Sequence, residues 1–213
     1  MNRFLIAIFT VLLVQSQARS QSTETPKFEV AAEFTSLERE GFGTRRSEAG
    51  FGGRFTFNLN RLVSLETATY YFPKRCFDCQ NNGNLTEVFG GVKVGKQFEK
   101  WGIFAKARPG IASFSDGKTN IEPDPASPVF PFRFEPERLT TFAADVGGVV
   151  EFYCSKRIVT RFDAGDTLIH FGRRRADFIA FNSTTATFFI APLTLPPRTA
   201  HNFQFMASVG WRF

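Results

Sequence analysis

Three observations in the amino-acid sequence predict an all-β protein whose strands close into an antiparallel barrel. Apolar residues alternate with polar or small ones in eight stretches of about ten residues that begin at Lys27. The connections between these stretches are alternately short and long. Phe is unusually frequent, with 28 among 213 residues, yet the chain has no apolar run of the roughly 20 residues that a membrane-spanning helix needs.

The first four strands are predicted from strict alternation. In each of them one face is apolar and the other carries charges, hydroxyl groups or glycine. They are Lys27–Leu37 with Phe28, Val30 and Phe34 on the apolar face, Ala49–Leu59 with Phe51, Phe55 and Phe57, Leu62–Phe72 with Val63, Leu65 and Tyr71, and Thr86–Lys96 with Val88, Val92 and Val94.

The second half of the chain repeats this pattern four times. The predicted strands are Trp101–Ser113 with Ile103, Ala105 and Ile111 on the apolar face, Thr141–Tyr153 with Phe142, Val146 and Phe152, Ile158–Phe171 with Ile158, Thr160 and Phe162, and Asn202–Phe213 with Phe203, Phe205 and Trp211. Continued alternation in the seventh strand would place Asp166 and His170 on the apolar face. We therefore predict a β-bulge at Gly165-Asp166 that reverses the parity, and Pro109 predicts a second irregularity in the fifth strand.

The lengths of the connections predict how the barrel lies in a membrane. Short connections at residues 58–61, 97–100 and 154–157 alternate with long ones at 38–48, 73–85, 114–140 and 172–201. This sorting is typical of an up-and-down transmembrane β-barrel, which has short periplasmic turns and long extracellular loops. Two apolar segments inside the last loop, Ala176–Asn182 and Ala186–Pro192, are shorter than a membrane-spanning strand, so we predict that they form a hairpin above the membrane.

The composition of the polar face indicates which face points inward. A soluble lipocalin-like barrel would enclose the apolar face, whereas a membrane barrel turns it toward lipid. The polar face carries seven acids and six bases with glycines between them, which fits a narrow, filled interior where opposite charges pair. The predicted lumen charge network consists of Glu29, Glu33, Arg54, Glu66, Glu87, Lys93, Lys106, Arg108, Asp145, Glu151, Arg161, Asp163 and Arg212.

The predicted lipid-facing surface ends in aromatic residues, as the two membrane interfaces of such a barrel require. The aromatic residues near the predicted strand ends are Phe57, Tyr71, Trp101, Phe152, Trp211 and Phe213.

The N-terminus has the features of a bacterial secretory signal peptide. A basic head precedes an 11-residue apolar run, Phe4–Val14, and Ala18-Arg19-Ser20 suits cleavage before Gln21. The predicted organisation is a signal peptide at 1–20, a periplasmic segment at 21–26 and a barrel domain at 27–213. No Cys stands at the cleavage point, which argues against a lipoprotein, and a net charge of +6 does not indicate nucleic-acid binding.

The three cysteines carry no predicted chemistry. Cys76 and Cys79 could close a loop disulfide in an oxidising compartment, which leaves Cys154 unpaired. There is no second Cys pair or neighbouring His to complete a zinc site. We predict no catalytic residue, metal or cofactor.

The chain resembles the small OmpA/OmpX-like class of bacterial outer-membrane β-barrel proteins. The resemblance is most specific in the C-terminal strand, where Phe205, Ala207, Val209, Trp211 and Phe213 match the assembly signal of that class. It implies that the outer-membrane assembly machinery recognises this strand and that the protein resides in the outer membrane. No peptidoglycan-binding domain follows residue 213, so the resemblance does not extend to a cell-wall tether.

The favoured function is that of a non-enzymatic outer-membrane barrel whose loops contact lipopolysaccharide or an extracellular partner, which the sequence does not identify. Aromatic residues at Val129–Phe134 and Asp177–Ile190 could extend the barrel wall above the membrane, and Arg173, Arg174 and Arg175 could contact lipopolysaccharide phosphates. The alternatives are a narrow channel, a soluble ligand-binding barrel and a lipid A-modifying enzyme. The last would require His170 or His201 to act with a hydroxyl such as that of Ser183.

Overall fold

The computed structural model describes residues 26–40, 45–73, 82–124, 126, 131–184 and 187–213. The predicted signal peptide and the Cys76–Cys79 pair lie outside these residues. None of the described residues forms a helix long and apolar enough to cross a membrane.

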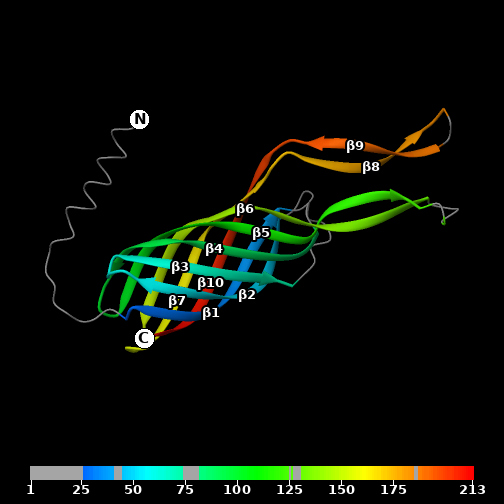
Figure 1. The fold of residues 1–213 in the computed structure, drawn as a ribbon. Coiled ribbons are helices and arrows are strands. Elements are labelled where there is room, and N and C mark those ends of the chain that lie inside the picture. Colours follow the sequence, from blue (N-terminus) through cyan, green and yellow to red (C-terminus); the bar gives the residue numbers. More distant parts are fainter. Residues whose placement is uncertain (1–25, 41–44, 74–81, 125, 127–130, 185–186) are drawn as a thin grey trace, which may run out of the picture.

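Eight of the described strands form a closed antiparallel barrel (Figure 1). Each barrel strand pairs with the barrel strands before and after it in the chain, so that β7 pairs with β10. The ring closes where β1 pairs with β10. The predicted fold, an eight-stranded up-and-down barrel, is therefore confirmed. The barrel strands are β1 (Phe28–Glu40), β2 (Arg45–Asn58), β3 (Val63–Phe72), β4 (Asn82–Gln97), β5 (Trp101–Pro123), β6 (Phe132–Tyr153), β7 (Ile158–Phe171) and β10 (Arg198–Arg212).

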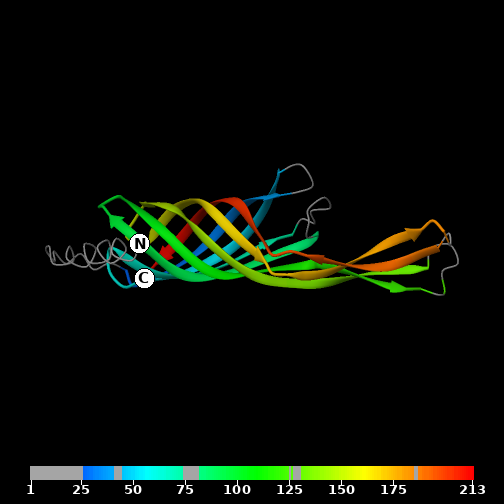
Figure 2. The ribbon, with the colours of Figure 1, turned by 90° about the horizontal axis from the view of Figure 1, so that it is seen from above.

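Two hairpins continue beyond the barrel at one end (Figures 1 and 2). One is the far part of β5 and β6, where residues 118–123 pair with residues 132–137 after a register shift. The other is a separate two-stranded sheet of β8 (Arg174–Asn182) and β9 (Thr187–Leu195), which confirms the predicted hairpin. Much of the predicted loops 114–140 and 172–201 is therefore strand. We call this end of the barrel the arm end, and the end with the short connections the turn end.

Side-chain burial follows the alternation of the sequence. The apolar positions of the barrel strands face outward; Phe34 and Val209, for example, are more than half exposed. The predicted interface aromatics share this face, and Trp101, Phe152 and Trp211 lie at strand ends near the turn end. Cross-strand pairs of small outward residues such as Ala32 with Gly53 lie between the two aromatic ends. The barrel thus has the apolar outer surface and aromatic rims expected of a membrane-spanning barrel.

The predicted bulge at Gly165-Asp166 is wrong. Pairing of β7 with both neighbours runs through these residues without a register shift. Asp166 and His170 therefore stay on the outward face, and Thr167 is buried inside the barrel. Gly165 lies opposite Gly147, and a Cβ on either would stand within 2.8 Å of the other's Cα. A side chain at either position would therefore clash with the facing strand.

Pro109 also causes no bulge. The β4–β5 ladder lacks the pairs of Pro109 and Arg108, because proline has no N–H to donate. The register is nevertheless the same on both sides, since Phe89 pairs with Gly110 and Val92 with Ala107. Proline therefore interrupts the hydrogen bonds but does not end the strand.

Candidate functional site

All thirteen residues of the predicted charge network point into the barrel. Each of them is exposed by 6% or less, and together they come from all eight barrel strands. They converge because every one occupies an inward position of a strand that closes around a narrow interior. Charges buried to this extent are tolerated only when they are paired and hydrogen-bonded.

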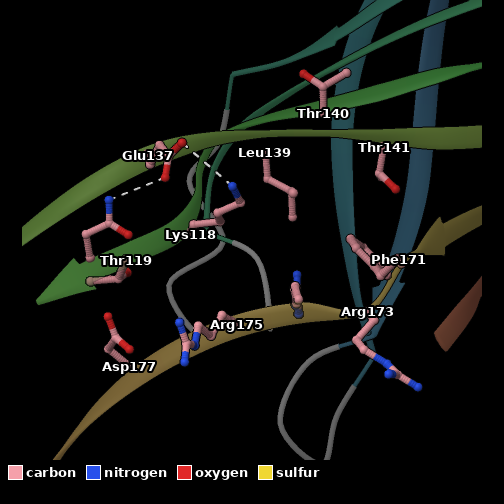
Figure 3. A pocket seen from close by; sticks show the side chains of 13 residues that line it. Lys118, Thr119, Glu137, Leu139, Thr140, Thr141, Phe171, Arg173, Arg175 and Asp177 are labelled. Atoms are coloured by element: carbon pink, nitrogen blue, oxygen red, sulfur yellow. Dashed lines mark hydrogen bonds and ion pairs between the residues drawn. The ribbon is translucent and has the colours of Figure 1, made fainter. Parts of the chain in front are cut away.

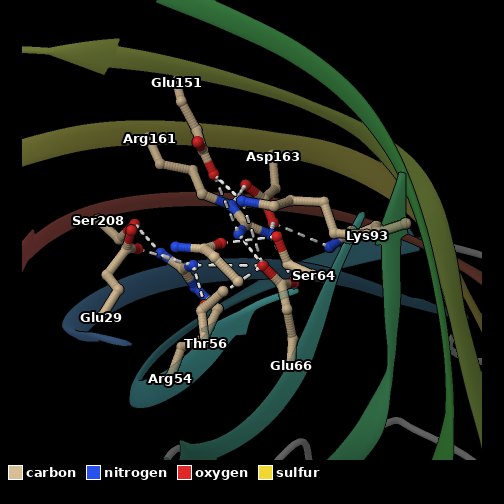
Figure 4. A network of polar contacts seen from close by, with 12 residues as sticks. Glu29, Arg54, Thr56, Ser64, Glu66, Lys93, Glu151, Arg161, Asp163 and Ser208 are labelled. Atoms are coloured by element: carbon tan, nitrogen blue, oxygen red, sulfur yellow. Dashed lines mark hydrogen bonds and ion pairs between the residues drawn. The ribbon is translucent and has the colours of Figure 1, made fainter. Parts of the chain in front are cut away.

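Glu66 on β3 is the centre of the network (Figure 4). Its carboxylate accepts hydrogen bonds from both terminal nitrogens of Arg161, and it lies 3.4 Å from Arg54 Nη1. Lys93 Nζ and Arg108 Nη1 lie 3.6 and 3.7 Å from its two oxygens. One carboxylate therefore lies within ion-pair distance of four cations from four other strands, and it links opposite walls of the barrel.

The remaining acids complete the charge balance of the cations around Glu66. Arg54 also pairs with Glu29 at 3.0 Å and Glu33 at 2.8 Å. Glu151 binds Lys93 and lies 3.6 Å from Arg161. The tyrosine hydroxyl of Tyr70 donates to Glu33 at 2.6 Å. Each of these acids therefore faces at least one cation.

A second group of charges lies beside the first. Lys106 bridges Asp145 at 2.8 Å and Asp163 at 3.2 Å, and Asp145 also binds Arg108. Asp163 in turn accepts a hydrogen bond from Arg161 Nε at 2.6 Å. Because Arg108 and Arg161 both reach Glu66, the two groups form one continuous network.

Glu87 is the member of the predicted set that stays apart. It is fully buried, and among the described residues it forms no ion pair. Its nearest polar partner is the amide of Gln204, which donates at 3.4 Å. The sequence parity placed Glu87 correctly in the interior, but parity carries no information about which cation would reach it.

An apolar plug fills much of the interior toward the arm end, where the buried Glu87 and the ion pair between Arg39 and Glu48 also lie. Its members occupy inward positions, some in the middle of their strands and others near the strand ends opposite the short turns. Sequence analysis missed it, although the inward parity of Phe72, Phe114 and Phe171 could have shown it. The plug consists of Leu37, Ala68, Tyr70, Phe72, Leu85, Phe89, Ala112, Phe114, Ala143, Ile169, Phe171, Ala200 and Met206.

The predicted arginine cluster lines a cavity outside the plug. The cavity has a volume of about 520 Å³ and lies between the β5–β6 hairpin and the start of β8 (Figure 3). Arg173, Arg174, Arg175 and Lys118 border it. The guanidinium of Arg174 lies 5.1 Å from the centre of the Phe171 ring. Glu137 and Asp177 also line the cavity, and Glu137 pairs with Lys118 at 3.6 Å, so cations outnumber acids around it. Partial burial and the like charge of Arg198 lower the pKa of Arg174.

The predicted C-terminal signal residues lie at the seam that closes the barrel. Phe205, Val209, Trp211 and Phe213 face outward, and Ala207 is half-buried on the same face. The backbone of Phe213 exchanges two hydrogen bonds with Phe28, at 3.0 and 2.9 Å. The last residue of the chain thus pairs directly with the first strand.

The cysteine and histidine residues form no metal site in the described part of the chain. No group of three or more His, Cys, Asp or Glu side chains there could hold a metal ion. Cys154 is an exposed free thiol at the turn end, 3.5 Å from the Thr160 hydroxyl. The predicted Cys76–Cys79 disulfide falls outside the described residues.

Comparison with known proteins identifies the fold but no sequence family. No protein-family model matches the chain, and no curated protein matches it significantly. Neisserial surface protein A superposes with a TM-score of 0.51 at 12% identity, over 88% of this chain and 97% of that one. The attachment protein Ail of Yersinia pestis gives 0.49 at 10% identity, over 87% and 97%. The N-terminal barrel of Pseudomonas aeruginosa OprF gives 0.44 at 14%, over 86% and 97%. This chain therefore has the fold of the small eight-stranded outer-membrane β-barrel proteins.

Proposed function

We propose that this chain is a non-enzymatic outer-membrane protein of a bacterium, exported by a cleaved signal peptide at 1–20. A closed ladder with an apolar outer surface and an ion-paired interior carries this proposal, because it suits a lipid environment outside and needs no water within. The arm end is then extracellular, and the two hairpins present surface to lipopolysaccharide or to an extracellular partner. Insertion would depend on the outer-membrane assembly machinery acting on β10.

The interior opposes the alternative of a narrow channel. Permeating ions would have to break the ion pairs around Glu66 and then pass the apolar plug, in which Phe72 and Leu85 are fully buried. The buried polar side chains beside the plug are bonded to one another, as Gln204 is to Thr35, Glu87 and Thr167. We therefore assign the interior a structural role.

Two measurements on the whole protein test this proposal. The outer-membrane fraction should contain a species whose gel mobility changes on boiling, and the reconstituted protein should give no discrete conductance steps in a planar bilayer. A mass spectrum of lipid A that is the same with and without expression of the protein would support the absence of lipid-modifying activity. Regular single-channel steps would contradict the filled interior, and a soluble, detergent-independent protein would contradict the membrane location.

Replacing the three arginines of the cavity should weaken binding to lipopolysaccharide. Each cation near an anionic lipid surface contributes about 1 kcal/mol, so Arg173→Gln, Arg174→Gln and Arg175→Gln together should lower affinity by roughly a hundredfold. The loss should shrink as salt rises, since these side chains are at least partly exposed. Binding of purified lipopolysaccharide to the reconstituted variant at two ionic strengths measures both effects.

A matched variant separates this site from general charge. Arg45→Gln with Arg46→Gln removes two exposed arginines at the start of β2, away from the cavity. It should change affinity much less than the triple variant. Equal affinity in the triple variant and the wild type would remove the arginine cluster from the proposal.

A further inference from the structure

The outward wall of β7 and β10 carries an acid and two histidines among exposed apolar side chains. Asp166 on β7 lies opposite Phe203 of β10 and Val146 of β6, and both neighbours are exposed apolar residues. His201 lies one row farther toward the arm end, opposite Leu168. An acidic side chain on the lipid-facing surface is costly, so residues of this kind usually serve a function.

Asp166 and His201 are bound to each other. His201 Nδ1 lies 2.7 Å from Asp166 Oδ2, with side-chain exposures of 68% and 38%. A carboxylate can only accept a hydrogen bond, so the imidazole proton must reside on Nδ1. Among the described residues, no group contacts Nε2 of His201. Because the His201 side chain is 68% exposed, Nε2 of the neutral ring can accept a hydrogen bond from a group outside the barrel.

A second polar pair lies next to the first on the same wall. His170 pairs in register with Thr199, and its Nδ1 lies 3.0 Å from the Thr199 hydroxyl. Phe142 lies opposite His170 on β6 and is more than half exposed, so the apolar surface reaches at least to this row. Asp166 is four residues nearer the turn end and is therefore inside the apolar belt. We call Asp166, His170, Thr199 and His201 the polar wall patch.

We propose that the polar wall patch binds the sugar-linked acyl region of an outer-leaflet glycolipid, with a lipid hydroxyl or amide N–H donating to His201 Nε2. An imidazole that carries its single proton on Nδ1 accepts a hydrogen bond at Nε2. Diacyl glycerophospholipids offer only ester carbonyls there, which accept hydrogen bonds, whereas acylated amino-sugar lipids carry amide N–H and hydroxyl groups. The inference rests on the proposed outer-membrane location and adds a lipid contact on the barrel wall, separate from the arginine cavity.

A competition for bound lipid tests the patch. Wild-type protein is reconstituted with equal amounts of lipid A and phosphatidylethanolamine, and native mass spectrometry then counts the lipids that stay bound. The wild type should retain lipid A over phosphatidylethanolamine. Asp166→Leu with His201→Leu removes both polar groups and leaves no lone charge, and it should lower lipid A retention at least tenfold.

The control removes a different outward polar pair. Ser36 and Ser47 share a 2.7 Å hydrogen bond between β1 and β2, so Ser36→Ala with Ser47→Ala should leave lipid A retention unchanged. Boiling-dependent gel mobility verifies insertion of every variant. An inserted wild type without lipid A preference, or a double leucine variant that retains lipid A normally, would overturn the patch alone. Retention of phosphatidylethanolamine that depends on the pair would overturn the glycolipid assignment, and a wild type that fails to insert would overturn the proposed location as well.

Discussion

The Glu66→Gln variant is expected to lose about 3–5 kcal/mol of unfolding free energy, the usual cost of removing one partner from a buried ion pair. The substitution keeps the side-chain volume but removes the charge that Arg54, Lys93, Arg108 and Arg161 share. Four buried cations would then face each other with too few acids. Urea unfolding in lipid vesicles, followed by the fluorescence of the outward Trp101 and Trp211, measures the loss.

Two further variants isolate the cause of this effect. Glu135→Gln removes an exposed acid that pairs with the exposed Arg133 on the β5–β6 hairpin, and it should change stability by less than about 1 kcal/mol. Glu66→Gln combined with Arg161→Met should cost less than the sum of the two single changes, because each removes the same interaction. Additive losses in the double variant would mean that Glu66 and Arg161 do not depend on each other.

The barrel architecture could be predicted because alternation is a local property of the chain. Successive side chains of a strand point to opposite faces, so the sequence alone assigns Arg54, Lys93 and Arg161 to one face. The near balance of acids and bases on that face then distinguishes a filled interior from a solvated surface. Partner choice could not be predicted, because it depends on the stagger of strands around the ring. Glu87 shows this limit, since it shares the interior parity but forms no ion pair with any cation among the described residues.

The sequence-based prediction missed the apolar plug because the inward face of a strand was expected to be polar along its whole length. The inward face of β3 carries Glu66 near its middle and Phe72 at its end, so its character changes from charged to apolar toward the arm end. Height within the barrel decides this change, and height depends on strand tilt. The sequence does not fix the tilt without knowledge of the register.

The failed bulge at Gly165 has a related cause. The prediction assumed that an acid cannot remain on the outward face, so the inward and outward positions of β7 had to exchange after Gly165. The assumption neglected a partner on the adjacent strand, and His201 supplies that partner across 35 residues of sequence. A long-range contact of this kind leaves no local trace in the sequence.

Deleting Trp211, Arg212 and Phe213 is expected to abolish most of the folded protein, with the boiling-sensitive species reduced more than tenfold. The deletion removes the backbone pairs between Phe213 and Phe28 and leaves donors and acceptors of β1 without partners at the seam. Unsatisfied backbone groups in a membrane cost several kcal/mol each, and 1.4 kcal/mol corresponds to a tenfold change. Gel mobility of the outer-membrane fraction measures the result.

Comparison of cells with purified components separates ring closure from recognition of the terminal aromatic residue. Phe213→Ala keeps the backbone pairs with Phe28 and loses only the ring contact between the two side chains, whose centres lie 5.9 Å apart. It should refold in vesicles nearly as well as the wild type but assemble poorly in cells if the assembly machinery recognises Phe213. Phe188→Ala removes an exposed aromatic residue from the β8–β9 hairpin and should assemble normally in both settings. Normal assembly of Phe213→Ala in cells would show that β10 acts only through the seam, because backbone pairing would then suffice for insertion.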